Sequence, residues 1–270
     1  MKTVRKLYFF LVFAFLYLPI FILVAFSFNS SKSRAVFSGF SFKWYEKLFN
    51  DEDIILALLN TFFVAIVASL LAAIIGTMAA IGINRFKKIP RKIFLNLNSM
   101  SMVSPEIISG VSLMVLFVSL FKLVKLFKLG LLTLVLAHTT ICIPTVVLSV
   151  LPKLYNMDPC LKYAAKDLGC TPIKAFFKVT FFYILPGIVS GTLMSFTLSL
   201  DDFIISYFTG GTTQLLPVLI YSMTKKIISP EINALSSVLL FFVFILIIVV
   251  NFLNKKDFKN KRVKKTTLNL

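Results

Sequence analysis

Residues 54–84 read IILALLNTFFVAIVASLLAAIIGTMAAIGIN, which is 31 consecutive residues without an acidic or basic side chain. A helix needs about 20 mostly apolar residues to cross the hydrocarbon core of a bilayer. This stretch is longer than that minimum, so it predicts a helix that is tilted or that extends beyond the lipid. The stretch indicates an integral membrane protein.

Further apolar segments lie on both sides of this stretch. Hydrophobic residues make up 58% of the 270 positions, phenylalanine alone occurs 30 times, and the mean hydropathy is +0.92. A soluble domain of this size could not bury so much apolar surface. We therefore predict an all-α integral membrane protein with six transmembrane helices, at residues 7–28, 54–84, 93–120, 131–151, 186–209 and 232–253.

The first segment has some features of a secretory signal. Lys2, Arg5 and Lys6 precede it, and Ala25-Phe26-Ser27 resembles a cleavage site. Its apolar run has 22 residues, however, whereas a signal core has about 7–15. We interpret residues 1–53 as a retained transmembrane helix followed by an external segment.

The basic residues predict the orientation of the helices. With both termini in the cytoplasm, the cytoplasmic segments carry 20 of the 29 Lys and Arg residues. The positive-inside rule favours this topology, although three lysines in residues 121–130 are an exception to it. We attribute the net charge of +18 to topology and to anionic lipid headgroups, not to a nucleic-acid partner. Residues 254–270 are too basic to form a core, and we expect them to be disordered.

The residue types that carry catalysis or cofactors are scarce. Cys142, Cys160 and Cys170 have no C-x-x-C spacing, so neither a disulfide framework nor a zinc site is indicated. His138 is the single histidine and is expected to be a packing residue, which disfavours an intramembrane metalloprotease. No G-x-x-x-x-G-K-[ST] motif for ATP phosphates occurs in the chain. We therefore predict a non-catalytic protein without a cofactor of its own.

A recognisable motif lies between the fourth and fifth predicted helices, in residues 152–185. Residues 158–172 read DPCLKYAAKDLGCTP. The Asp-Pro pair predicts the start of a short helix, and Gly169 and Pro172 predict its end. Ala164, Ala165 and Leu168 would give this helix a low-profile face suited to a groove of another protein. The alternative interpretation is an ordinary surface loop.

The pattern of Ala164-Ala165, Gly169 and Leu185-Pro186 resembles the E-A-A loop of ABC-importer permeases. The resemblance implies a type I ABC-importer permease of MetI-like architecture, in which a coupling helix within residues 164–176 docks on an ATPase subunit. It assigns to that contact Tyr163, Ala164, Ala165, Asp167, Leu168, Gly169 and Pro186, and it starts the fifth helix at Pro186 and Gly187. Tyr163 stands where the family has its glutamate, so no ionic contact by that side chain is implied.

Other stretches resemble the polyamine permeases within this family, and together they cover most of residues 54–250. They are SPEII at 104–108, SFTLSLDDF at 195–203, Leu216-Pro217, IYSM at 220–223 and SPEINAL at 229–235. This resemblance implies import of spermidine and putrescine through a bacterial cell membrane by alternating access. The implied partners are a second similar permease, two ATPase subunits that bind ATP and Mg²⁺, and an extracytoplasmic polyamine-binding protein. Alternatives are the same machine for ferric iron, an amino acid or another small cation, or a secondary transporter.

Three carboxylates, Glu106, Asp201 and Asp202, lie within predicted membrane helices. Each costs about 2.5–3.5 kcal/mol at a helix centre, so such residues tend to face protein or water and to serve function. Carboxylates along a path would offset the desolvation of a polyamine, which is a multivalent cation. We therefore assign them to the substrate pathway, together with Tyr221, which lies in one of the matching stretches. Glu106 follows Pro105, which is expected to bend the third helix.

Helical periodicity separates the two aspartates. On one continuous helix, Asp202 shares a polar stripe with three serines at i, i+4, i+7 and i+11 spacing, namely Ser195, Ser199 and Ser206. Asp201 falls on a more apolar side. Asp202 is therefore expected to face the pathway, with Ser195 and Ser199 beside it. The alternative is that Asp202 holds the helices together by hydrogen bonds.

Overall fold

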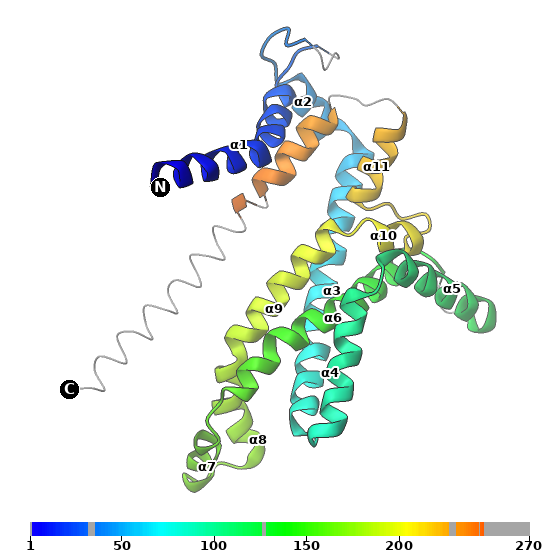
Figure 1. Cartoon of the computed structure of the whole chain (residues 1–270). Coiled ribbons are helices and arrows are strands. Elements are labelled where there is room, and N and C mark those ends of the chain that lie inside the picture. Colours follow the sequence, from blue (N-terminus) through cyan, green and yellow to red (C-terminus); the bar gives the residue numbers. More distant parts are fainter. Residues whose placement is uncertain (1, 32–35, 126–127, 227–230, 243, 246–270) are drawn as a thin grey trace. The chain divides into compact units, whose positions relative to one another are not determined.

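The computed structural model describes residues 2–31, 36–125, 128–226, 231–242 and 244–245 (Figure 1). Regular structure in these residues is entirely helical, with one isolated β-bridge between Asn29 and Phe40. The chain forms two compact units, one made of Met1–Ile55 with Ser222–Leu270 and the other of Leu56–Tyr221.

The first unit contains α1 (Lys2–Ser27), α2 (Lys43–Asn50) and a short apolar helix over Glu231–Phe242. Its polar contacts centre on Asn29, whose Nδ2 donates to the carbonyl of Val36 at 2.8 Å. The carbonyl of Asn29 accepts from the Trp44 indole at 2.6 Å, which fixes α2 against the end of α1. Lys47 of α2 forms an ion pair with Glu231. These bonds order the segment that follows the first membrane helix.

Five helices of the described part are long and apolar enough to cross a membrane. Three of them correspond to predicted spans, as α1, α3 (Glu52–Arg85) and α6 (Leu131–Tyr155). Of the predicted span 232–253, the structure describes Glu231–Phe242 and residues 244–245. The rest of that span and the tail 254–270 lie outside the described residues.

The prediction of one helix over residues 93–120 is wrong. The segment forms α4 (Lys88–Val103) and α5 (Glu106–Val124), which are separated by an extended Ser104 and by Pro105. Proline disfavours helical geometry in the residue before it and has no N–H to donate. Pro105 therefore ends one helix and precedes the next, instead of bending a single helix as expected.

The prediction of one helix over residues 186–209 is also wrong, at both ends. A helical run begins at Pro172 and passes through α8 (Pro172–Ala175), the π-helix η1 (Phe176–Phe181) and α9 (Phe182–Asp201). Pro186 lies inside α9 and does not start it. Asp202 is extended, and a separate helix, α10 (Ile204–Thr209), follows.

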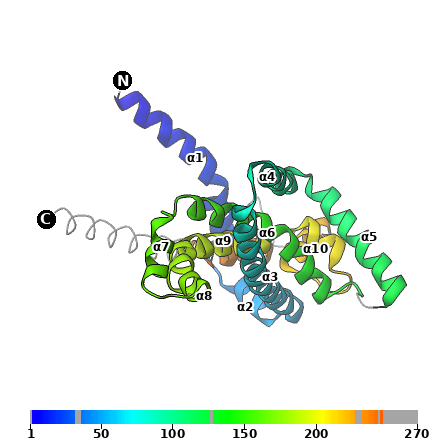
Figure 2. The same ribbon diagram turned by 90° about the horizontal axis from the view of Figure 1, so that it is seen from below.

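The core of the second unit is the contact between α6 and α9, which α3 joins (Figures 1 and 2). Small residues allow the close approach, as is common between membrane helices. A Cβ atom at Gly187 would lie 2.9 Å from the carbonyl oxygen of Ser149, and one at Gly76 would lie 2.8 Å from Val146. Both glycines are therefore needed for space.

Two further contacts complete this unit. The backbone N–H of Leu216, at the start of α11 (Leu216–Lys226), donates to Thr61 of α3 at 2.8 Å. Helix α10 packs beside α5, and Figure 2 shows the two together. The two helices lie close together at Gly110, where a Cβ would lie 3.0 Å from Phe208.

Candidate functional site

The predicted loop helix is present as α7 (Cys160–Asp167). Asp158 accepts a hydrogen bond from the backbone N–H of Cys160 at 2.9 Å, and Pro159 is the N-cap residue. At the other end Gly169 has φ +78°, a conformation that glycine adopts at no steric cost. Its N–H donates to Lys166, and that of Cys170 donates to Ala165, which is a Schellman motif. The expected start at Asp158-Pro159 and the stop at Gly169 are confirmed, whereas Pro172 begins α8 and does not end α7.

Most residues assigned to the ATPase contact are exposed on or next to α7. Tyr163 and Leu168 are 63% and 85% exposed, and Ala164 and Asp167 are also exposed. Ala165 is buried and packs this helix against its own subunit. The remaining assigned residue, Pro186, is half-buried within α9, so it belongs to the membrane helix and not to the loop. Helix α7 and the residue after it thus present an apolar and aromatic surface that the described residues leave exposed.

The break between α9 and α10 lies in a buried polar cluster, which we define as His138, Ser199, Asp202 and Ser206. His138 of α6 bonds Ser199 through Nδ1 at 2.7 Å and Ser206 through Nε2 at 3.1 Å. The Ser206 hydroxyl also donates to the carbonyl of Asp202 at 2.6 Å. One imidazole therefore links both halves of the interrupted helix to α6.

Asp202 is the charged member of this cluster. Its Oδ1 accepts from the N–H of Ile205 at 3.3 Å, which supports the first turn of α10. Its Oδ2 is buried, has no hydrogen-bond partner among the described residues, and lies 3.6 Å from His138 Nε2. A buried carboxylate oxygen without a donor is costly, so this atom is suited to interact with a cation.

The other two predicted acids lie near Asp202. Glu106, in the first turn of α5, and Asp201, the last residue of α9, are both exposed. Both lie close enough to Asp202 for electrostatic repulsion. Tyr221 of α11 packs on Phe203 with ring centroids 4.6 Å apart, beside the break. The fold thus places Glu106, Asp201 and Tyr221 near Asp202, in addition to Ser199 of the same polar cluster.

The two serines assigned to the pathway, Ser195 and Ser199, face the interior of the subunit. Ser195 is fully buried and donates to the carbonyl of Cys142 on α6 at 3.2 Å, while Ser199 bonds His138. The predicted stripe of Ser195, Ser199, Asp202 and Ser206 does face one way, but toward α6, and the helix carrying it is interrupted at Asp202.

Sequence reasoning treated His138 as a packing residue and missed its hydrogen bonds to both halves of the broken helix. No local signal identifies the partners of these bonds, because they are 61 and 68 positions away in the chain. The sequence indicates only that His138 is a polar aromatic side chain within an apolar segment, which favours a hydrogen-bonding role there.

The sequence matches a known family across most of this helical unit. Residues 72–256 match the family described as the binding-protein-dependent transport system inner membrane component. The chain belongs to this family. Since its members are inner membrane components of transport systems, this permease is a membrane subunit, in agreement with the predicted fold class.

Two relatives are at least 36% identical to this permease in amino-acid sequence. It is 36% identical over 254 residues to the spermidine/putrescine transport system permease protein PotC of Haemophilus influenzae, covering 94% of the chain and 97% of the relative. It is 40% identical over 231 residues to the putrescine transport system permease protein PotI of Escherichia coli K12, covering 84% and 82%.

Solved structures of similar fold come from ABC transporters. A transporter involved in import of the acidic polysaccharide alginate aligns with a TM-score of 0.72 at 16% identity, covering 94% of this permease and 93% of that chain. An inward-facing form of the MetNI methionine ABC transporter aligns with a TM-score of 0.55, covering 75% and 97%. At these identities the likeness concerns the fold, which is that of an ABC-importer permease.

Proposed function

We propose that this chain is the permease subunit of an ATP-driven importer that moves spermidine and putrescine into the cytoplasm. The observation that carries the proposal is its similarity, over nearly the full length of both chains, to a permease named for these two substrates. The relative named for putrescine alone supports the same substrate class. Both substrates are flexible chains that carry several ammonium groups at neutral pH.

The acids beside the helix break suit such a substrate. Glu106, Asp201 and Asp202 place negative charge at the junction of α5, α9 and α10. A polyamine loses hydration when it enters the membrane, and nearby carboxylates offset part of that cost. We assign the substrate contact to Asp202, whose buried Oδ2 has no hydrogen-bond donor among the described residues and would become accessible during transport, with Tyr221 beside it. Ser195 and Ser199 would support the position of these acids by holding α9 against α6.

The coupling to ATP is assigned to α7. Its exposed residues around Tyr163 and Leu168 would occupy a groove of an ATPase subunit, which binds and hydrolyses ATP with Mg²⁺. A second, similar permease, a second ATPase and an extracytoplasmic polyamine-binding protein would complete the importer. Closure of the ATPases would move α7, and rigid-body rocking would open the pathway inward. In this arrangement both termini lie in the cytoplasm of a bacterial cell.

Uptake measurements test this proposal directly. The chain would be expressed with its partner subunits in bacteria that lack polyamine importers, and uptake of labelled spermidine and putrescine would be followed. We expect saturable uptake that disappears when the ATPase subunit is inactivated by substitution. Uptake restricted to ferric iron, an amino acid or another small cation would overturn the substrate. Uptake that survives ATPase inactivation would instead indicate a secondary transporter.

The purified chain provides a second test. Without its partners it should neither bind nor hydrolyse ATP, since it has no phosphate-binding loop of the common type. Robust hydrolysis by the chain, free of contaminating ATPase, would contradict the division of labour between subunits.

A further inference from the structure

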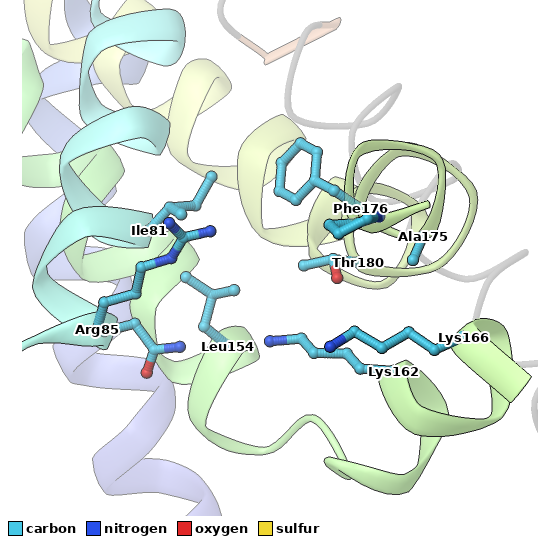
Figure 3. A pocket seen from close by; sticks show the side chains of 10 residues that line it. Ile81, Arg85, Leu154, Lys162, Lys166, Ala175, Phe176 and Thr180 are labelled. Atoms are coloured by element: carbon cyan, nitrogen blue, oxygen red, sulfur yellow. The ribbon is translucent and has the colours of Figure 1, made fainter. Parts of the chain in front are cut away.

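A basic cavity of about 220 Å³ lies between α7 and the adjoining ends of the membrane helices (Figure 3). Its cations are Arg85 at the end of α3 and Lys162 and Lys166 of α7. The two lysines are four residues apart on one helix, so they project from the same face. Figure 3 shows both extending from α7 toward the helices that carry Arg85 and Leu154.

The described residues provide no negative charge that balances the positive charge in this cavity. No acidic residue lines the cavity, and none of its three cations forms an ion pair within the described residues. An adjoining cavity of about 600 Å³ shares both lysines and adds Arg91, whose guanidinium lies 3.7 Å from the ring centroid of Tyr155. Several like charges around one concave surface favour a bound anion.

The cavity also has an apolar wall. Ile81, Leu154 and Phe176 line it together with the cations. It lies where α3 and α6 end, which is the depth of lipid headgroups if these helices cross the bilayer. Basic pockets between membrane helices on the cytoplasmic side bind phosphate-containing headgroups, and the cytoplasmic leaflet is rich in anionic lipid.

We propose that this cavity binds a phosphate group, supplied by the headgroup of an anionic phospholipid. The phosphate would bridge Lys162 and Lys166 to Arg85 and so hold α7 against the end of α3. The apolar wall suits the glycerol and upper acyl chain of a lipid, which a free phosphate lacks. The site is separate from the acids at the helix break and does not depend on which substrate the permease carries.

Native mass spectrometry of the full chain in detergent tests the proposal, with phosphatidylglycerol and phosphatidylcholine as probes. We expect selective retention of phosphatidylglycerol. Lys162→Gln with Lys166→Gln should weaken it roughly thirtyfold, since each lysine near an anionic surface contributes about 1 kcal/mol. The matched control is Lys174→Gln with Lys178→Gln, which removes two exposed charges nearby that do not line the cavity. The control should retain the lipid.

Two additions make the result decisive. Arg85→Gln removes a cavity charge from a different helix, so it tests the site even if the double variant disturbs α7. Inorganic phosphate in excess distinguishes the sources, because lysine-dependent binding of phosphate without lipid selectivity would assign the site to a free anion. Equal loss in the cavity and control variants would indicate nonspecific attraction and overturn the site. Unchanged binding in both, with loss of the ATPase subunit only in the cavity variant, would assign these lysines to a protein contact instead.

Discussion

Helices α9 and α7 both depend on glycine, for opposite reasons. In α9, Gly187 and Gly191 lie against α6, and a Cβ atom at either would fall 2.9–3.0 Å from atoms of that helix. At Gly169, after α7, a Cβ would meet no atom within 4 Å, but φ is +78°. At Gly187 and Gly191 a larger side chain is excluded by lack of space. At Gly169 other residues are disfavoured by the backbone conformation. The same residue type therefore marks a packed interface in one region and an exposed turn in the other.

The difference indicates what each region does. Helix α9 is held by a close interface with α6 and by the polar cluster around His138, so its position is determined within the subunit. Helix α7 buries only Ala165 and exposes its aromatic and apolar side chains. A helix with so little support in its own chain is suited to be stabilised by a partner.

Gly187→Leu should have the largest effect on the protein. The side chain would displace the backbone at Ser149, and overpacking costs about 1–3 kcal/mol, with the upper end expected where the close atom belongs to the backbone. We expect loss of monodisperse protein in size-exclusion chromatography and a lower thermal midpoint in detergent. Gly82→Leu on α3 is the matched control, because a Cβ there meets no atom within 4 Å. Equal damage from both would mean that the α6–α9 interface is not specifically packed.

Gly169→Leu should abolish transport while leaving the membrane helices intact. A left-handed backbone costs a non-glycine residue about 1–2 kcal/mol, so the end of α7 would rearrange. We expect normal abundance in the membrane with lost uptake or lost association of the ATPase. Gly169→Asn should preserve more activity, since asparagine tolerates this conformation. Wild-type transport by the leucine variant would exclude α7 as the coupling element.

Asp202→Asn should strongly reduce spermidine uptake without loss of assembly. The substitution keeps the size of the side chain and removes the negative charge of a carboxylate whose Oδ2 has no hydrogen-bond donor among the described residues. Asp201→Asn is the comparison and should have the smaller effect, since Asp201 is exposed and lies outside the polar cluster. The reverse order would reject our choice between the two acids. Severe loss of assembly in both would favour a purely structural role at the end of α9.

His138→Ala should destabilise the subunit moderately. It leaves the buried hydroxyl of Ser199 without its imidazole partner, and an unsatisfied buried polar group costs about 1–3 kcal/mol. The measurement is the thermal midpoint of the purified permease. Thr140→Ala, an exposed α6 position whose hydroxyl bonds only its own helix, should change little. A similar midpoint for both variants would show that the cluster does not secure the broken helix.

The smallest expected effect concerns the thiol of Cys160 at the start of α7. A hydrogen bond to Asp158 and the charge of that carboxylate raise the pKa of Cys160. Asp158→Asn should lower this pKa, increase the thiolate fraction at neutral pH and speed alkylation by a maleimide a few-fold. The rate would be measured in a Cys170→Ser background from pH 7 to pH 9. The difference should shrink as pH rises, and a constant difference would indicate altered exposure of α7 instead.

Local sequence signals predicted much of the fold. Long apolar segments located α1, α3 and α6, and the Asp158-Pro159 and Gly169 pair located α7 within a few residues. The two breaks were not predicted. Pro105 was recognised but was expected to bend one helix, and the break at Asp202 follows a stretch with neither glycine nor proline. Directly after this break, Ser206 forms a hydrogen bond with His138, which lies on another helix.

Membrane residence and the loop helix could be read from the sequence alone, because hydropathy sums over neighbouring residues and turn signals act within a few positions. The family resemblance and its motifs likewise reside in contiguous stretches. The tertiary structure, in contrast, determines which polar side chains contact one another. His138 reaches both sides of the helix break, and Arg85 faces Lys162 and Lys166, only because packed helices bring distant segments together. Contacts of this kind depend on helix packing in three dimensions, which no local pattern encodes.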